Sequence, residues 1–347
     1  MAGPAIISAE ALGRFIAEIF TRVGMPDAHA STVADVLVWA NLRGVDSHGV
    51  ARVPRYVDMI QGGVMNPNPA ITVRTETSAA VVLDTDRAAG PVAMRAAMAA
   101  AVGKAREAGI GLGIARATTH TGALGYYTQS AAHEGMAALA LAASWPNMAY
   151  HGARAAGVST SPISIAVPAG ARPPVVFDMG TGVVSVGTLM QARRAGQPIP
   201  AGSALDQHGL PTTDPARAEI PLPIAGPKGS GLALMIELIT SLVVANPILA
   251  DALDGGGEGR RHRQNGLAIA IDLARFGDPQ MYAREVERLV TALRALPRDP
   301  DAAEILIPGE RGDRVFRQRS RDGIPVPPAT CAELGLVADR LGVTMFS

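Results

Sequence analysis

A short polar segment, Asp46-Ser47-His48-Gly49, is followed by Arg52, four residues after the histidine. Histidine is the side chain that exchanges a proton most readily near neutral pH, so His48 is a candidate acid or base. The planar guanidinium of an arginine binds a carboxylate through two hydrogen bonds. A proton-exchanging group next to a carboxylate-binding group is what the reduction of a 2-oxo acid requires.

The same spacing fits a structural role equally well, in which His48 caps the next helix and Arg52 lies on a solvated face. Ser47 beside His48 does not indicate a hydrolase, because chain neighbours point apart and a serine nucleophile needs its base from elsewhere in the fold. The G-x-S-x-G elbow of many hydrolases is also absent from the sequence. The segment alone therefore leaves a catalytic and a structural interpretation open.

Three other turns contain residues that suit ligand binding. The first, Thr118 to Gly122 with His120 at its centre, follows a predicted strand and opens a predicted helix, where backbone N–H groups bind anions. Taken alone, a capped helix start is its simpler interpretation. The second, Gly226 to Gly231, places Lys228 in a glycine turn before a long apolar helix, which suits a diphosphate, a carboxylate or simple solvation. The third, Pro308 to Arg311, predicts a turn and little else.

The elements that must position these turns follow from hydrophobic periodicity. The chain opens with two predicted helices, one starting at Ser8 and ending near Gly24, the other running from Asp27 to Arg43. Short strand-like runs are predicted at 71–73, 80–83, 110–115, 137–143, 163–167, 175–177 and 267–271, with helices at 92–108, 183–195 and 231–245 between them. The tail is predicted to be helical at 281–295, 313–321 and 329–341. The pattern predicts an α+β fold, with a helical layer from both termini around a β-rich middle.

Composition narrows the class of protein. Lys plus Arg and Asp plus Glu number 31 each, so the basic face that a nucleic-acid partner needs is not expected. The single cysteine, Cys331, cannot form an internal disulfide, and the histidines show no metal-ligand spacing. No apolar stretch is long enough to span a membrane or to act as a signal peptide. We therefore expect a cytoplasmic protein with no metal, no membrane and no nucleic acid bound.

One glycine-rich stretch argues against the usual dinucleotide fold. Gly109-Ile-Gly111-Leu-Gly113 lies after a predicted helix and inside a predicted strand, without the third glycine of the Rossmann fingerprint. A nicotinamide cofactor would therefore bind here by another fold.

Taken together, the segments resemble one family, the malate/L-lactate dehydrogenases that are unrelated to the Rossmann-fold enzymes of similar name. The family includes ureidoglycolate and sulfolactate dehydrogenases, diketogulonate reductase and Δ1-piperideine-2-carboxylate reductase. The resemblance covers nearly the whole chain. Its most specific part is Gly44-Val-Asp-Ser-His-Gly-Val-Ala-Arg-Val-Pro-Arg-Tyr56, and further matching blocks follow in order at 118–125, 176–179, 211–215, 227–232, 308–310 and 323–325.

The resemblance implies a largely antiparallel, non-Rossmann sheet that binds NAD or NADP, in a homodimer. It also implies a helical domain of residues 1–75 plus 280–347, carrying His48 and Arg52, and a β-rich cofactor domain of residues 76–279. The implied catalytic residues are His48 as proton donor, Ser47 orienting it, and His120 as a proton acceptor, while Arg52 and Thr160 bind substrate. The implied cofactor-binding residues are Thr121, Gly122, Ala123, Leu124, Gly125, Ser144, Asp178, Met179, Gly180, Lys228, Gly229, Pro308, Gly309 and Glu310.

The chain also departs from the family pattern around these residues. Thr119 and Thr121 flank His120 where the family commonly has Asn and an aromatic residue, and Thr188 stands where some members have a carboxylate. Similar changes occur at Ser161, at Gly180-Thr181-Gly182 and at Ser230. The predicted function is hydride transfer between NAD(P)H and a small 2-oxo acid. Reduction of a cyclic imine acid and a catalytically weak nicotinamide-binding protein remain as alternatives, and the sequence leaves the substrate and the choice between NAD and NADP open.

Overall fold

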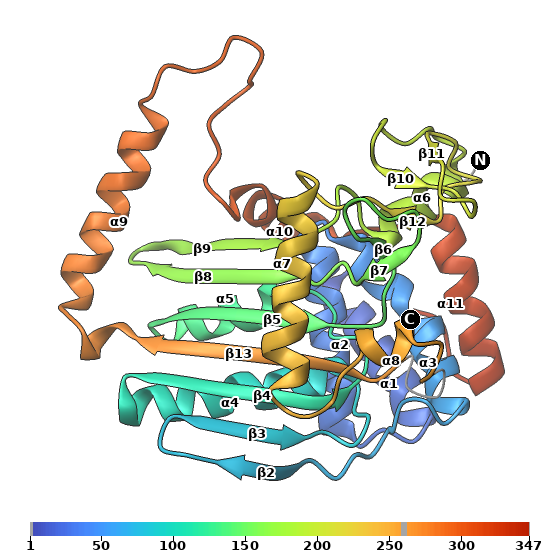
Figure 1. Cartoon of the computed structure of the whole chain (residues 1–347), viewed down its shortest axis with the longest axis horizontal. Coiled ribbons are helices and arrows are strands. Elements are labelled where there is room, and N and C mark those ends of the chain that lie inside the picture. Colours follow the sequence, from blue (N-terminus) through green and yellow to red (C-terminus); the bar gives the residue numbers. More distant parts are fainter. Residues whose placement is uncertain (1–2, 258–261, 347) are drawn as a thin grey trace.

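The computed structural model describes residues 3–257 and 262–346 and is built around a seven-stranded sheet (Figure 1). In spatial order the strands are β2 (Thr72–Glu76), β3 (Ala80–Asp84), β4 (Ile110–Thr118), β13 (Gln264–Asp272), β5 (Met136–Ala143), β8 (Ile163–Ala169) and β9 (Arg172–Met179). β3 and β4 run parallel, and the other neighbouring pairs are antiparallel. The prediction of a mixed fold with a largely antiparallel sheet is confirmed.

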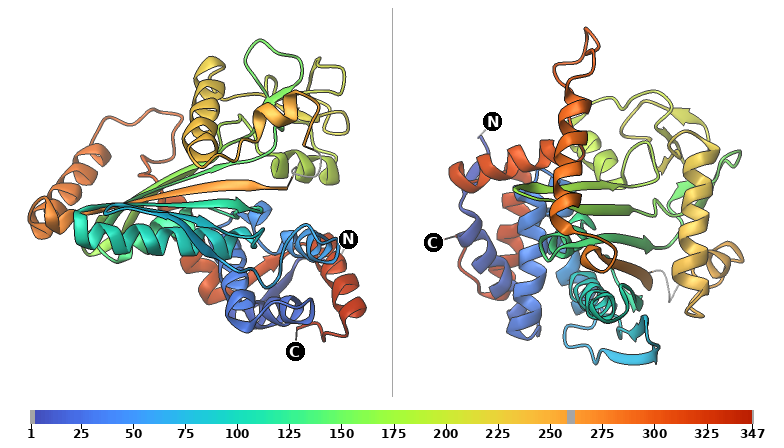
Figure 2. Two further views of the ribbon diagram at one scale, coloured as in Figure 1. Left: turned by 60° about the horizontal axis from the view of Figure 1, so that its bottom comes forward. Right: turned by 90° about the vertical axis from the view of Figure 1, so that its left-hand side faces the viewer.

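One face of the sheet is covered by α4 (Gly90–Ala108) and α5 (Gly125–His133), which pack on a layer of buried alanines (Figure 2). The two glycines of β4 allow this close approach. A Cβ at Gly111 would lie 1.9 Å from the carbonyl oxygen of Ala101, and one at Gly113 would lie 2.0 Å from that of Ala97. The glycine-rich stretch therefore serves helix–sheet packing rather than nucleotide binding.

The opposite face is covered by α7 (Pro227–Glu237) and the π-helical turn η3 (Leu238–Leu242). The sequence predicted one helix over 231–245, but the structure starts it at Pro227 and widens it at Leu238. The widening accompanies a buried carboxylate: Glu237 accepts hydrogen bonds from the backbone N–H groups of Ile248 (2.8 Å) and Leu249 (3.1 Å). These bonds tie the helix to α8 (Leu249–Leu253).

The terminal segments form a helical layer against the α4 side of the sheet (Figure 2). Its members are α1 (Ala9–Arg22), α2 (Asp27–Leu42), α3 (Val53–Gln61) and α11 (Pro328–Leu341), with β1 (Ala5–Ile7) paired antiparallel to β14 (Ile324–Val326). As predicted, Ser8 caps α1, its side chain accepting from the N–H of Ala11 at 3.1 Å. One buried cluster joins residues of both chain ends, including Phe20, Tyr56 and Leu334.

Two further helices come after β13, the last strand of this sheet along the chain. α10 (Glu310–Asp322) packs on α2, while α9 (Pro279–Arg294) contacts β8, lies beyond the ends of the strands and projects from the body (Figure 1). The remaining elements are α6 (Val186–Ala195) and the short strands β6 (Met148–Ala149), β7 (Ala156–Val158), β10 (Ala204–Leu205), β11 (Pro211–Thr212) and β12 (Ile220–Pro221). None of the helices in the described ranges combines the length and apolar character that a bilayer crossing requires.

Candidate active site

Two histidines from distant parts of the chain face each other. His48 ends the 3-10 turn η1 (Asp46–His48), and His120 follows the end of β4. Their rings are stacked, with centroids 5.6 Å apart and an interplanar angle of 21°. The Ser47 hydroxyl lies 3.1 Å from Nδ1 of His48. The structure thus brings together the two histidines that the sequence singled out.

The orientation of His120 depends on a tyrosine to which the sequence assigned no role. The hydroxyl of Tyr56, on α3, lies 2.7 Å from Nδ1 of His120, and the backbone N–H of Gly122 points at the same nitrogen from 3.4 Å. Because an N–H can only donate, Nδ1 is the acceptor, and we assign the ring proton to Nε2 on this geometry. Tyr56 follows Arg52 by four residues, one helical turn, which is the signal that would have found it.

Both imidazoles are held neutral. Burial, with a smaller contribution from Arg52, lowers the pKa of His48 to about 4. Burial also lowers the pKa of His120 well below its usual value, assisted by Arg52, His48 and Arg55. Burial raises the pKa of the Tyr56 hydroxyl, so it stays protonated and can donate. At neutral pH the site therefore presents two uncharged rings. His48 is the one placed to accept a proton, because Nδ1 of His120 already accepts from Tyr56 and Gly122 and its Nε2 carries the ring proton.

The motif around His48 is held by a polar network. The side-chain oxygen of Asn41, on α2, accepts from the N–H of Val50 at 2.8 Å, and its amide donates to Asp46 at 2.5 Å. Asp46 also accepts from Arg319 of α10 at 2.6 Å. A Cβ at Gly49 would lie 2.1 Å from the Asn41 side-chain oxygen, so the glycine is needed for this close packing. The segment is thus rigidly positioned by both terminal parts of the chain.

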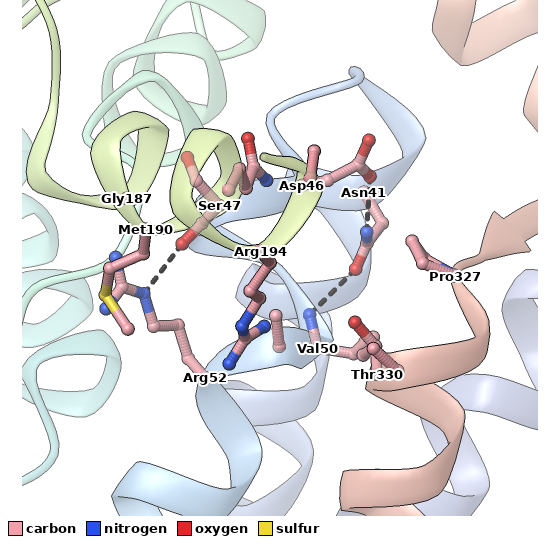
Figure 3. A pocket seen from close by; sticks show the side chains of 14 residues that line it. Asn41, Asp46, Ser47, Val50, Arg52, Gly187, Met190, Arg194, Pro327 and Thr330 are labelled. Atoms are coloured by element: carbon pink, nitrogen blue, oxygen red, sulfur yellow. Dashed lines mark hydrogen bonds between the residues drawn. The ribbon is translucent and has the colours of Figure 1, made fainter. Parts of the chain in front are cut away.

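Arg52 lies in the wall between two cavities. Its Nε donates to the Ser47 carbonyl at 2.7 Å, and it lines both the cavity beside the histidines and a second cavity of about 370 Å³. Figure 3 shows the second cavity, where Arg52 lies beside Gly187 and Met190 of α6 and Thr330 of α11 lies opposite. The second cavity was not predicted, because it forms between segments far apart in the sequence.

The cavity beside the histidines has a volume of about 320 Å³ and is lined by most of the predicted site residues: His48, Arg52, His120, Thr121, Gly122, Ala123, Leu124, Ser144, Thr160, Asp178, Met179 and Gly180. Gly125 lies next to it and donates its N–H to Asp178 at 2.7 Å. Asp178 is open to the cavity yet surrounded by protein, and this burial raises its pKa to about 6. The cavity also contains polar residues that the sequence did not single out, namely Arg55, Asn147 and Gln264.

The other predicted cofactor residues do not line this cavity. Lys228 and Gly229 lie in the first turn of α7, and a Cβ at Gly229 would be 2.5 Å from the Ile224 carbonyl oxygen. Pro308, Gly309 and Glu310 form a turn against β9, at a separate cavity that Pro308 and Glu310 help to line. Thr188 lies on α6, where its hydroxyl is 2.9 Å from that of Ser185.

The Gly309 turn also has structural partners. The Gly309 carbonyl accepts from the buried Arg43 at 3.0 Å, and Glu310 forms an ion pair with Arg294.

The sequence predicted a helix from 183, but α6 begins at Val186 because Ser185 caps it, accepting from the N–H of Thr188 at 3.0 Å.

Comparison with known proteins agrees with this architecture. The chain is 33% identical over 348 residues to the malate dehydrogenase of Pyrococcus horikoshii, covering 95% of this chain and 93% of that protein. It is 32% identical over 324 residues to the ureidoglycolate dehydrogenase (NAD(+)) of Escherichia coli K12, covering 92% of each.

Solved structures extend the similarity to three dimensions. A malate dehydrogenase from Pyrococcus horikoshii has a TM-score of 0.89 at 30% identity, covering 99% of this chain and 97% of that chain. Δ1-piperideine-2-carboxylate reductase from Pseudomonas syringae has a TM-score of 0.86 at 27% identity, covering 96% and 100% respectively. Residues 7–335 match the family described as malate/L-lactate dehydrogenase, and the chain therefore belongs to that family.

Proposed function

We propose that this protein is an NAD(P)-dependent dehydrogenase that interconverts a small 2-hydroxy acid and its 2-oxo acid. The observation that supports this most strongly is the stacked pair His48 and His120 with Arg52 in the wall of the same cavity. The malate and ureidoglycolate dehydrogenases named above act on hydroxy acids, which agrees with this chemistry.

His48 exchanges the proton at the C2 oxygen of the substrate. A neutral imidazole is ready to accept that proton when the hydroxy acid is oxidised, and the protonated ring returns it in the reverse direction. Arg52 binds the substrate carboxylate through its terminal amino groups, since its Nε is already held by the Ser47 carbonyl. Tyr56 and Ser47 keep the two rings in place.

The residues of the cavity fit a nicotinamide cofactor. Small residues such as Gly122, Ala123 and Gly180 leave space for a flat ring, while Ser144 and Asn147 offer polar groups to a carboxamide. A bound nicotinamide would supply or accept the two electrons and the hydrogen at C2. We assign Lys228, Gly229 and the turn Pro308–Glu310 to the rest of the cofactor on family resemblance.

The test is a panel of substrates with each cofactor. Pyruvate, oxaloacetate, sulfopyruvate and a cyclic imine acid should be assayed with NADH and NADPH, with absorbance at the nicotinamide band as the readout. We expect turnover of at least one 2-oxo acid. Turnover of the imine acid alone would support the alternative of C=N reduction, and tight cofactor binding without any turnover would support a catalytically inactive relative.

Two substitutions test the assigned roles. We expect His48→Ala to lose about 100-fold or more in kcat while cofactor affinity is kept, because general acid–base catalysis contributes on that scale. We expect Arg52→Ala chiefly to raise the KM of the acid substrate. The assignment is wrong if both variants keep wild-type kinetics on the substrate that the panel identifies.

The assembly and the location of the protein are also part of the proposal. We propose a homodimer, because α7 and η3 leave an exposed apolar surface that includes Met235, Leu238 and Leu242. Light scattering of the wild type and of Met235→Glu tests this, and a wild-type monomer would contradict it. We also propose a cytoplasmic location, which cell fractionation can check.

A further inference from the structure

Backbone strain is concentrated around the strand end that leads to His120. Among the described residues, five that are not glycine have a positive φ, and three of them are Asp86 (46°), Arg87 (59°) and Ala117 (59°). These three lie in two neighbouring segments, joined by the hydrogen bond from the Arg87 N–H to the Ala117 carbonyl at 2.8 Å. A Cβ makes this left-handed conformation unfavourable, so the surrounding contacts must maintain it. Such strain is typical of sites where a functional side chain has to be placed.

The strain at Ala117 coincides with a β-bulge between β4 and β13, which lie side by side in the sheet (Figure 1). The register of this pair shifts between Gln264 and Gly266, so that Asn265 faces an extra residue of β4. A bulge bends its strand and changes the direction of the side chains that follow it. The first residue after this bulge that lines the catalytic cavity is His120.

Asn265 is fully buried, and its side-chain amide makes four hydrogen bonds. Its Oδ1 accepts from the backbone N–H of Ala117 at 3.1 Å and from the side-chain amide of Asn246 at 2.7 Å. Its Nδ2 donates to the Ser241 hydroxyl at 2.9 Å and to the Asn246 carbonyl at 3.0 Å. The Ser241 hydroxyl in turn donates to the buried Glu237 at 2.7 Å. A side-chain amide with all its donors and acceptors engaged is fixed in one orientation.

The segment leading to His120 is also fixed from another side. The carbonyl of Ala88 accepts from the hydroxyls of Thr118 at 3.2 Å and Thr119 at 3.0 Å, and both threonines are fully buried. A Cβ at Gly90 would lie 2.1 Å from the His120 carbonyl oxygen, so the two backbones are in close contact. The direction in which the segment leaves β4 is therefore set at the bulge.

Resting on the proposed function, we infer that Asn265 is a positioning residue: by binding the Ala117 N–H it maintains the left-handed bulge of β4 and so places the His120 ring. Asn265 is not among the described residues that line the catalytic cavity, so it acts through the backbone and touches neither substrate nor cofactor. The ring has to lie in this place to stack on His48 and to meet the Tyr56 hydroxyl. Loss of the Asn265 amide therefore lowers turnover rather than binding.

The first measurement is steady-state kinetics on the acid that the substrate panel identifies. We expect Asn265→Ala to lose about tenfold or more in kcat, because displacing a catalytic ring has effects on this scale. The KM values of the acid and the cofactor should change by about twofold at most. Asn265→Asp keeps an oxygen for the Ala117 N–H and should recover most of the lost kcat.

The matched control is Asn246→Ala. This variant removes another buried amide of the same network and leaves the bond from the Ala117 N–H to Asn265 in place. We expect its kcat to stay within about threefold of the wild type, even where its thermal stability falls as far as that of Asn265→Ala.

Relief of the strain should rescue the variant. Glycine adopts the left-handed conformation readily, so a bulge with Ala117→Gly depends less on Asn265. We expect the double variant Asn265→Ala/Ala117→Gly to reach a kcat within about threefold of that of Ala117→Gly. This comparison also decides the matter if Asn265→Ala alone does not fold. A double variant that stays tenfold or more below Ala117→Gly would contradict the inference.

A second readout does not depend on turnover. The ¹⁵N signals of the histidine rings report which ring nitrogen carries the proton, and the signals missing in His120→Gln identify those of His120. We expect the wild-type ring to be protonated on Nε2 alone, and Asn265→Ala to show a mixture of both forms.

Two further results would overturn the inference. One is an unchanged His120 signal in Asn265→Ala, and the other is an equal loss of kcat in Asn265→Ala and Asn246→Ala. Absence of turnover with every acid of the panel, together with the expected change in the His120 signal, would instead reject the proposed function and support the placement of the ring by Asn265.

Discussion

At the scale of single residues, burial gives the histidine pair its chemical character. An unperturbed histidine is partly protonated at neutral pH, with a pKa of about 6.5. In this site burial and Arg52 lower the pKa of His48 to about 4, so the ligand-free enzyme is prepared to accept a proton. Reduction of an oxo acid therefore requires a proton to be taken up from solution, and the incoming carboxylate favours that uptake by its negative charge.

The pH dependence of oxidation follows from this shift. In the proposed mechanism neutral His48 is the base and protonation inactivates it, so kcat/KM should fall as the pH drops through about 4, apart from any separate step near pH 6 from the Asp178 carboxyl in the same cavity. His48→Ala is the control, since an acid limb that persists in it belongs to the substrate or to unfolding, which circular dichroism can monitor. An acid limb near pH 6.5 that His48→Ala removes would show that burial does not set this pKa.

The residues of the local motif could be predicted, whereas those that join distant segments could not. His48 and Arg52 share one turn, so their types and spacing were enough to suggest proton exchange and carboxylate binding. The bond from Tyr56 to His120 depends on α3 meeting the end of β4, which no local pattern specifies. For the same reason Arg55, Asn147 and Gln264 were found in the cavity only once the fold was known.

At the scale of elements, helix α6 packs against the segment that carries Ser47 and Arg52, and Gly187 is the residue of α6 at this contact. A Cβ at Gly187 would lie 2.8 Å from Cβ of Ser47 and 3.2 Å from Nη2 of Arg52. Contacts this close force one side to move. Helix α6 therefore limits the positions open to the Arg52 side chain, although α6 and Arg52 are far apart in the sequence.

Gly187→Ala should therefore impair catalysis more than folding. We expect kcat/KM to fall about tenfold, because misplacing a substrate-positioning group by a fraction of an ångström has costs on this scale. Gly13→Ala in α1 is the matched control, since nothing lies within 4 Å of its added Cβ. Wild-type kinetics in Gly187→Ala, at unchanged thermal stability, would show that α6 adapts without moving Arg52.

At the scale of the whole molecule, the two chain ends are joined by a buried ion pair. Arg43 at the end of α2 pairs with Asp313 of α10 and also donates to the Gly309 carbonyl at 3.0 Å. The α+β class and the helical layer could be predicted, because periodicity marks the helices near both ends. The projection of α9 away from that layer could not, because its amphipathic pattern does not say which surface it meets.

Arg43→Met should destabilise the fold strongly. Removing one partner of a buried ion pair leaves the other charge unpaired, which costs about 3 kcal/mol or more in the free energy of unfolding. Urea denaturation measures this change. The double variant Arg43→Met/Asp313→Leu should recover much of the loss, and a single variant as stable as the wild type would show that the pair contributes little.

The most direct test of the proposed chemistry is a crystal structure with the nicotinamide cofactor and an unreactive analogue of the preferred 2-hydroxy acid bound. The measurement is the distance from the His48 ring nitrogen to the C2 oxygen, read together with the partners of the Arg52 guanidinium. We predict a hydrogen bond of about 2.6–3.2 Å at His48 and the C1 carboxylate on Arg52. A ligand bound with its C2 oxygen out of reach of His48, or with its carboxylate away from Arg52, would contradict the account.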